Sequence, residues 1–189
     1  MTPAKTKHPR AAAIEVARQM CAALKPCCEP DRLIVAGSLR RRRDEVGDIE
    51  IVYVSKTVQV PDGLFDLVTR QAVDQMLDHL LQTHALARRV SVIGRTAWGQ
   101  KNKLATHVAT GIGVDFFATT EEAWFNYLVC RTGPAESNTR LASTAQDRGW
   151  KWNPYGPGFT DARGEIVPVK SERDVFELLG LDYLEPWER

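Results

Sequence analysis

The sequence lacks a long hydrophobic run, has few cysteines and carries no large excess of either charge. No apolar run approaches the roughly 18 to 20 residues that span a bilayer, and the basic N-terminus has no apolar segment behind it, unlike a secretory signal. The 4 cysteines are too few for a disulfide scaffold and have no zinc-site spacing. The composition, 43% hydrophobic and 26% charged, is that of a globular protein. We therefore expect a cytoplasmic protein with reduced thiols and no membrane partner.

Basic residues are unevenly distributed, although the formal net charge is only +1. The segment between Ala85 and Val114 contains no acidic residue, and its basic residues are Arg88, Arg89, Arg95, Lys101 and Lys103. A local cationic surface can bind phosphates even when the whole chain is nearly neutral. We interpret these residues as a candidate phosphate-binding surface, with a merely solvated basic face as the alternative.

Hydrophobic periodicity predicts a mixture of helices and strands. Helices are predicted over 10–24, 64–84, 121–130, 136–148 and 171–179. Strands are predicted over 32–36, 48–55, 87–93, 103–110 and 112–118. Because the pattern changes after residue 118, we predict two domains, 1–118 and 119–189. The expected fold is α+β, with a mixed sheet flanked by helices and a small C-terminal lobe.

A glycine-serine pair and two acids lie close together in the sequence. Gly37 and Ser38 follow an apolar run, and such a strand-to-turn junction lets backbone amides approach a phosphate. Arg41 is near enough to reach further phosphate oxygens. Asp48 and Glu50 lie two apart in a predicted strand, so their carboxylates project to the same face. Two neighbouring carboxylates repel each other unless a cation lies between them, so this pair favours a magnesium site.

A third acid, Asp115, interrupts an otherwise apolar strand, Val114-Asp115-Phe116-Phe117. An acid at such a position is costly to bury without a counter-charge. If this strand neighbours the one that carries Asp48 and Glu50, the three carboxylates converge on a two-metal site. Such a site would activate a 3′-hydroxyl and stabilise a leaving pyrophosphate. Each feature alone is common on a solvated strand, whereas the combination is far more specific.

The combination resembles the family X DNA polymerases, the DNA polymerase beta group of the nucleotidyltransferases. The family's motifs read here as Gly37-Ser38, Arg40-Arg41, Gly47-Asp48-Ile49-Glu50 and Val114-Asp115. The similarity continues through Thr132-Gly133, Asn138, Gly149 and the closing stretch 167–186. The resemblance implies a nucleotidyltransferase palm followed by a small C-terminal α/β lobe that binds the nascent base pair.

The resemblance also implies roles for individual residues. Asp48, Glu50 and Asp115 would be the catalytic and metal-binding acids, with two Mg²⁺ ions as cofactor and Mn²⁺ as a substitute. The implied nucleotide-binding residues are Gly37, Ser38, Arg41, Gly47, Thr132, Gly133 and Asn138, with Ser38 and Arg41 on the β- and γ-phosphates and Asn138 on the base. The implied partners are a dNTP and a primer-template or gapped DNA duplex, bound by a monomer. The Gly133-Pro134 bond is predicted to be cis, since proline lowers the cost of that isomer.

Four positions depart from the family pattern. Glu50 stands where an aspartate is usual, and its extra methylene changes the reach of the carboxylate. Cys130-Arg131 replaces the aromatic pair that discriminates deoxyribose from ribose, so Arg131 could instead approach the triphosphate. Ala142 replaces an arginine, which weakens any minor-groove checking of the base pair.

The residues before Gly37 are too few for the lyase and DNA-gripping domains of larger family members. We therefore expect a minimal form with the palm and the C-terminal lobe only. In such a form the palm and lobe must contact DNA themselves, and the candidate DNA contacts are Arg88, Arg89, Arg95, Lys101 and Lys103. The predicted function is that of a magnesium-dependent, DNA-directed DNA polymerase that fills short gaps in DNA repair. The alternative is a template-independent nucleotidyltransferase that acts on a nucleic-acid end or a small acceptor. The intact acids argue against a catalytically inactive nucleic-acid-binding module.

Overall fold

A five-stranded mixed sheet forms the centre of the N-terminal part in the computed structural model, which describes residues 6–63, 66–90, 94 and 96–189. The strand order is β2 (Cys28–Val35), β4 (Ile49–Ser55), β9 (Gly113–Ala118), β8 (Asn102–His107) and β7 (Leu86–Arg88). β4 and β9 are parallel, and the other neighbouring pairs are antiparallel. The predicted mixed sheet is therefore confirmed.

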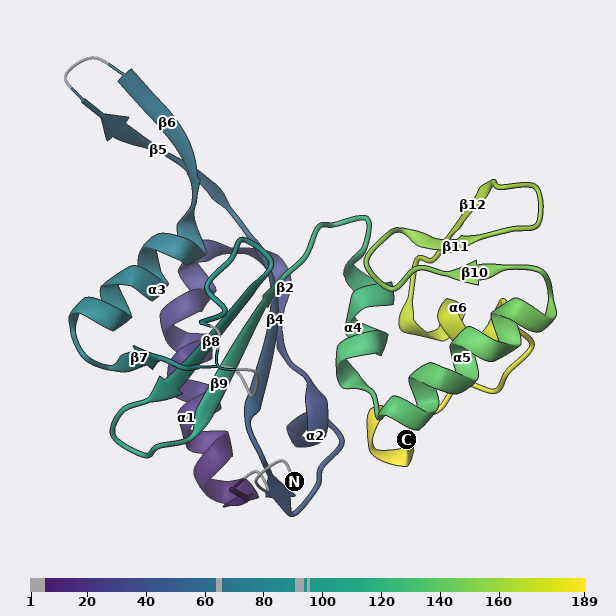
Figure 1. The fold of residues 1–189 in the computed structure, drawn as a ribbon, viewed down its shortest axis with the longest axis horizontal. Coiled ribbons are helices and arrows are strands. Elements are labelled where there is room, and N and C mark those ends of the chain that lie inside the picture. Colours follow the sequence, from purple (N-terminus) through teal and green to yellow (C-terminus); the bar gives the residue numbers. More distant parts are fainter. Residues whose placement is uncertain (1–5, 64–65, 91–93, 95) are drawn as a thin grey trace.

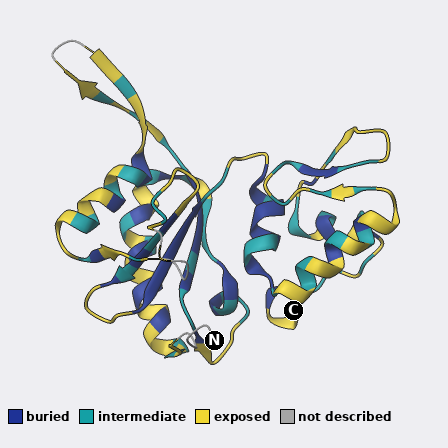
Figure 2. Ribbon diagram, in the orientation of Figure 1, coloured by how far each residue is buried: buried dark blue, intermediate teal, exposed yellow. Residues whose placement is uncertain are grey.

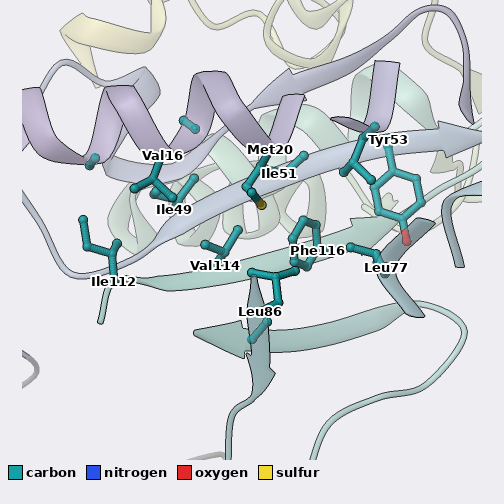
Figure 3. Packing of buried hydrophobic residues seen from close by; sticks show 14 of the residues in the cluster. Val16, Met20, Ile49, Ile51, Tyr53, Leu77, Leu86, Ile112, Val114 and Phe116 are labelled. Carbon is teal, nitrogen blue, oxygen red and sulfur yellow. The ribbon is translucent and has the colours of Figure 1, made fainter. Parts of the chain in front are cut away.

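Two helices, α1 (Arg10–Leu24) and α3 (Ala72–Gln82), cover one face of this sheet (Figure 1). Alternate residues of β4 and β9 point toward them, because successive side chains of a strand face opposite ways. Figure 3 shows this packing, with Ile51 and Phe116 from the sheet against Met20 of α1 and Leu77 of α3. Helix α1 has the bounds that the sequence predicts.

The predicted helix over 64–84 begins too early. Helix α3 begins at Ala72, and before it β5 (Thr57–Asp62) and β6 (Asp66–Gln71) form an antiparallel hairpin that projects from the body of the protein (Figure 1). Val60 pairs with Val68 across this hairpin. The β-branched residues of both strands favour extended structure, and this preference prevails over the helical spacing of the leucines.

A smaller lobe follows the sheet. It contains α4 (Trp124–Thr132), α5 (Ala135–Asp147), α6 (Glu172–Glu177) and a three-stranded sheet of β10 (Lys151–Trp152), β11 (Gly158–Thr160) and β12 (Ile166–Pro168). The lobe has its own apolar cluster around Phe159 and Phe176. This arrangement confirms the predicted α+β class with a small C-terminal lobe, while the domain boundary after residue 118 stays a prediction.

A third apolar cluster joins the lobe to the sheet. It contains Val52 and Phe117 from the face of the sheet that α1 and α3 leave uncovered, together with Trp124 and Leu128 of α4. Figure 2 shows the corresponding burial of β4, β9 and α4, in contrast to the exposed hairpin. The uncovered face of the sheet therefore looks toward the lobe.

Short elements complete the chain. They are β1 (His8–Pro9), the 3-10 turn Lys25–Cys27, α2 (Gly37–Arg40), β3 (Glu45–Val46) and the 3-10 turn Pro186–Glu188. The predicted strand over 87–93 is short, since β7 ends at Arg88 and residues 91–93 lie outside the described part of the chain. Among the described residues, no helix combines the length and the apolar character needed to cross a bilayer.

Candidate active site

The three predicted acids gather on the face of the sheet that looks toward the lobe. Strands β4 and β9 pair in parallel register, with Glu50 opposite Asp115. The neighbouring pairs, Ile49 with Val114 and Ile51 with Phe116, are buried on the helical side. Glu50 and Asp115 therefore lie side by side on the other face, because paired residues of neighbouring strands share a face. Asp48 immediately precedes β4 and reaches the same place, as its contact with Arg89 shows.

Arg89 provides positive charge among these acids. Its backbone N–H donates to Leu104 O at 2.9 Å, and Leu104 is the β8 partner of Asp115. Its Nη2 donates to Asp115 Oδ1 and lies 3.8 Å from Asp48 Oδ2. The sequence signals that Asp115 needs a counter-charge, but only the strand register identifies Arg89. The structure thus places Arg89 at the acidic cluster, and its role as a DNA contact stays a prediction.

The carboxylates suit a divalent cation, although they are not arranged as a finished site. Within the described residues, no group of three acidic, histidine or cysteine side chains is positioned to hold a metal ion. Asp48 and Asp115 nevertheless contact the same positive group, the Arg89 guanidinium, which serves as a stand-in cation. Carboxylate oxygens are also the donors that Mg²⁺ prefers. The donor set therefore fits a divalent cation, provided that Arg89 moves.

The glycine-serine turn lies directly beside Glu50. Gly37 opens α2 with a φ of +59°, a conformation that favours glycine, and a Cβ there would lie 2.9 Å from Glu50 Oε1. Ser38 follows in the same short helix and is half-buried. Gly47 lies between β3 and β4, immediately before Asp48. The backbone conformation therefore favours glycine at position 37, and a side chain there would displace the Glu50 carboxylate.

The arginine pair after this turn connects the sheet to the lobe. Arg41 Nη1 donates to the carbonyl of Thr132 at the end of α4, and Arg40 Nη1 donates to Thr132 Oγ1 at 2.7 Å. Arg40 also pairs with Glu172, with N–O distances of 2.5 and 2.9 Å. Burial, followed by the charge of Arg43, lowers the pKa of Arg41. A partly desolvated guanidinium beside the acids is suited to bind an anion.

The residues predicted to bind nucleotide on the lobe come together at the junction of α4 and α5. A Cβ at Gly133 would lie 3.3 Å from Arg41 Nη1, so this glycine lies against the sheet-borne arginine. The Gly133-Pro134 peptide bond is cis, which confirms the prediction. Asn138 Nδ2 donates to Cys130 O at 2.8 Å, while its Oδ1 is buried with no hydrogen-bond partner in the described part of the chain.

Arg131 packs against aromatic rings. Its guanidinium carbon lies 3.8 Å from the ring centre of Phe117 and 5.2 Å from that of Tyr127. The expectation that it could approach a triphosphate is therefore not what the structure shows. Stacking of this kind instead ties α4 to the sheet.

The other predicted DNA contacts have different surroundings. Lys103 is 4% exposed, with Nζ 2.7 Å from Asp74 Oδ1 and 2.9 Å from Gly99 O, so it anchors α3 to the sheet and is withdrawn as a DNA contact. Arg88 is exposed and lies over the Trp98 ring, 5.0 Å from its centre. Lys101 is also exposed, whereas Arg95 lies outside the described residues. Arg88 and Lys101 therefore stay predicted DNA contacts.

The ion pair of Arg40 with Glu172 was not foreseen from the sequence. These residues are 132 positions apart, and each side chain is less than one-fifth exposed. An acid at the start of the last helix is an ordinary first-turn residue, so its sequence context gives no sign of this role. Only the placement of the lobe against α2 reveals the pair.

Comparison with known proteins identifies relatives of this chain. A family model described as "DNA polymerase beta thumb" matches residues 127–189. DNA polymerase lambda of Rattus norvegicus is 27% identical over 97% of this chain and 33% of its own length. The DNA polymerase/3'-5' exonuclease PolX of Bacillus subtilis (strain 168) is 28% identical over 95% of this chain and 28% of its own length. The chain thus spans about a third or less of these relatives.

A solved structure agrees on the fold. Polymerase beta of Leishmania infantum, in a ternary P/T complex, superposes with a TM-score of 0.72 at 18% identity, covering 97% of this chain and 77% of that one. The matches to sequence relatives and to this structure each extend over nearly the whole chain. Over nearly its whole length the chain is thus homologous to DNA polymerases of the family X, polymerase beta-like group, and its C-terminal lobe matches the polymerase beta thumb.

Proposed function

We propose that the protein transfers a nucleotide from a dNTP to a primer 3′-hydroxyl, directed by a DNA template, and that it fills short gaps in DNA repair. The observation that carries this proposal is the pairing of Glu50 with Asp115 on the sheet face toward the thumb lobe, with Asp48 beside them. The homology to DNA polymerases supports nucleotidyl transfer as the reaction.

In this reaction the 3′-oxygen bonds to the α-phosphorus, and the bond from that phosphorus to the oxygen that bridges the α- and β-phosphates breaks, so that pyrophosphate leaves. The hydroxyl proton passes to the Asp115 carboxylate and from there to water. Asp115 orients the hydroxyl, and Asp48 and Glu50 provide the remaining negative charge of the site. When bound to these acids, divalent cations supply the positive charge that activates the hydroxyl and stabilises the leaving pyrophosphate.

Ser38 and Arg41 hold the β- and γ-phosphates in this proposal. Arg41 already reaches across to Thr132, so the triphosphate would lie between α2 and the end of α4. Phosphate oxygens can replace the Thr132 carbonyl as acceptor, because hydrogen bonds between two charged groups are stronger than those to a neutral carbonyl. Asn138, with its buried Oδ1 still lacking a partner among the described residues, faces the base.

A primer-extension assay tests the proposal. The protein is given a one-nucleotide gapped duplex or a bare single strand, with Mg²⁺ and each dNTP alone, and Asp115→Asn serves as the inactive control. Incorporation of the template-matched nucleotide only, abolished by EDTA, supports gap filling. Incorporation that ignores the template supports the template-independent alternative. If neither substrate is extended by wild type, the proposed function is wrong.

A further inference from the structure

The Arg89 guanidinium lies within the acidic cluster, where the proposed reaction gives it no task. Its Nη2 donates to Asp115 Oδ1 and lies 3.8 Å from Asp48 Oδ2. The side chains of these acids are only 11% and 14% exposed, so water compensates little of their charge. Arg89 therefore neutralises the same carboxylates that the proposed function assigns to divalent cations.

Arg89 and a divalent cation cannot share these carboxylates. Both are positive and would lie within a few ångströms of each other in a half-buried site, where charges are screened less than in water. Each would raise the free energy of the other. The acids are therefore bound either to the guanidinium or to metal, and the two states exclude each other.

The contacts of the Arg89 side chain allow it to leave. It meets the acids through one terminal nitrogen, and its Nε is buried without a hydrogen-bond partner among the described residues. The backbone N–H of Arg89 is held by Leu104 O, so the side chain can move without a shift of the strand. Arginine–carboxylate pairs are strongest when two guanidinium nitrogens bind the carboxylate together, and a contact through one nitrogen lacks this bidentate geometry.

Gly113 makes room for the guanidinium. A Cβ at this position of β9 would lie 2.9 Å from Arg89 Nη1 and 3.0 Å from Arg89 Cζ. These two atoms are the far end of a flexible side chain, and the next nearest, Asp48 Cβ, would lie at an ordinary contact distance of 3.4 Å. An alanine at 113 would therefore displace Arg89 while the strand and Asp48 stay in place. The guanidinium can therefore occupy this position only because residue 113 has no side chain.

We propose that Arg89 is a resident counter-cation that competes with divalent metal for Asp48 and Asp115. In the metal-free protein it stabilises the acidic cluster, and it must swing away before metal binds. The inference rests on the proposed function, since it takes these acids as the metal ligands. Its consequence is a weaker metal affinity in the nucleotide-free protein than the carboxylates alone would give.

The experiment titrates the nucleotide-free protein of 189 residues with Mn²⁺ and measures the free ion by electron paramagnetic resonance. Arg89→Gln removes the charge, and Gly113→Ala keeps the charge but displaces it. Arg88→Gln is the matched control, because Arg88 is the adjacent arginine and lies over Trp98. Asp115→Asn tests whether the ion binds at the acids at all.

We expect Arg89→Gln to bind Mn²⁺ at least about fivefold more tightly than wild type, and Gly113→Ala to change in the same direction. Arg88→Gln should stay within about twofold, which excludes a general effect of surface charge. If Arg89→Gln does not fold, Gly113→Ala decides the question.

Two outcomes overturn the proposal and can be told apart. An affinity of Arg89→Gln and Gly113→Ala equal to or weaker than wild type, while Asp115→Asn binds poorly, shows that metal binds at the acids without competition from Arg89. An Asp115→Asn affinity equal to wild type shows instead that the ion binds elsewhere. In that case the metal site of the proposed function fails as well.

Discussion

The two faces of the five-stranded sheet have opposite chemical characters, although the same strands build both. On one face, Ile51 and Phe116 are fully buried against α1 and α3. On the other, Glu50 and Asp115 stand at the adjacent positions of the same two strands. The change occurs from one residue to the next, because successive side chains of a strand point to opposite faces.

The contrast between the two faces explains how the protein holds acidic side chains, which are costly to bury, at the centre of its sheet. The helical face supplies apolar burial, which stabilises the parallel pair β4 and β9. The pair in turn holds Glu50 and Asp115 in fixed register, at a place where their charges favour a cation and disfavour an empty site. We therefore expect substitutions on one face to reduce stability and substitutions on the other to reduce activity.

The largest expected effect is that of Asp115→Asn on the acidic face. The substitution preserves shape but removes the charge, so nucleotidyl transfer should fall by at least about 10³-fold. The far-UV circular dichroism spectrum should stay that of wild type. Primer extension under single-turnover conditions measures the loss. A rate within about tenfold of wild type would contradict the assignment of this acid, and Asp48→Asn provides an independent check of it.

On the helical face, Phe116→Ala should have the second largest effect. Removal of a fully buried phenylalanine costs about 3 to 5 kcal/mol in the free energy of unfolding. The loss is measured by urea denaturation. The rate per folded molecule should fall far less than in Asp115→Asn, although the two positions are adjacent. A variant with wild-type stability would show that the packing of β9 on α3 contributes little.

A third prediction concerns the contact between the acidic face and the lobe. Glu172→Gln weakens the half-buried pair with Arg40 and a longer pair with the buried Arg189 at 3.5 Å, and it should cost about 1 to 3 kcal/mol in urea denaturation. The matched control is Glu177→Gln, because Glu177 pairs with Arg173 at 3.3 Å on an exposed helix surface. That change should cost less than about 0.5 kcal/mol. Equal costs would mean that the ion pairs of Glu172 do not stabilise the lobe more than an exposed pair does.

The smallest expected effect is that of Glu50→Asp. The substitution keeps the carboxylate but shortens the side chain by one methylene, so the carboxylate no longer reaches its place beside Gly37. We expect primer extension to fall by about tenfold or less and the dependence on Mg²⁺ to persist. A variant with no measurable extension would show that the longer side chain is required. The wild-type protein and Asp115→Asn set the upper and lower limits of the assay.

The sequence allowed much of the acidic face to be predicted. Alternation along β4 indicated that Asp48 and Glu50 share a face, and the apolar surroundings of Asp115 indicated a need for counter-charge. Where local preferences conflicted, prediction failed. The segment before α3 combined helical spacing with β-branched residues, and the hairpin β5–β6 formed instead. Lys103, predicted at a DNA-binding surface, is instead buried in an ion pair with Asp74 of α3.

The sequence by itself determined the strands, the acids on them and the turn at Gly37, because each depends on residues close together in the chain. The tertiary structure alone decided which residues neutralise and surround those acids. Arg89 reaches Asp115 through the register of two intervening strand pairings, and Arg40 meets Glu172 through the placement of the lobe. Register and lobe placement follow from the packing of the whole chain, and local sequence patterns do not encode such long-range contacts.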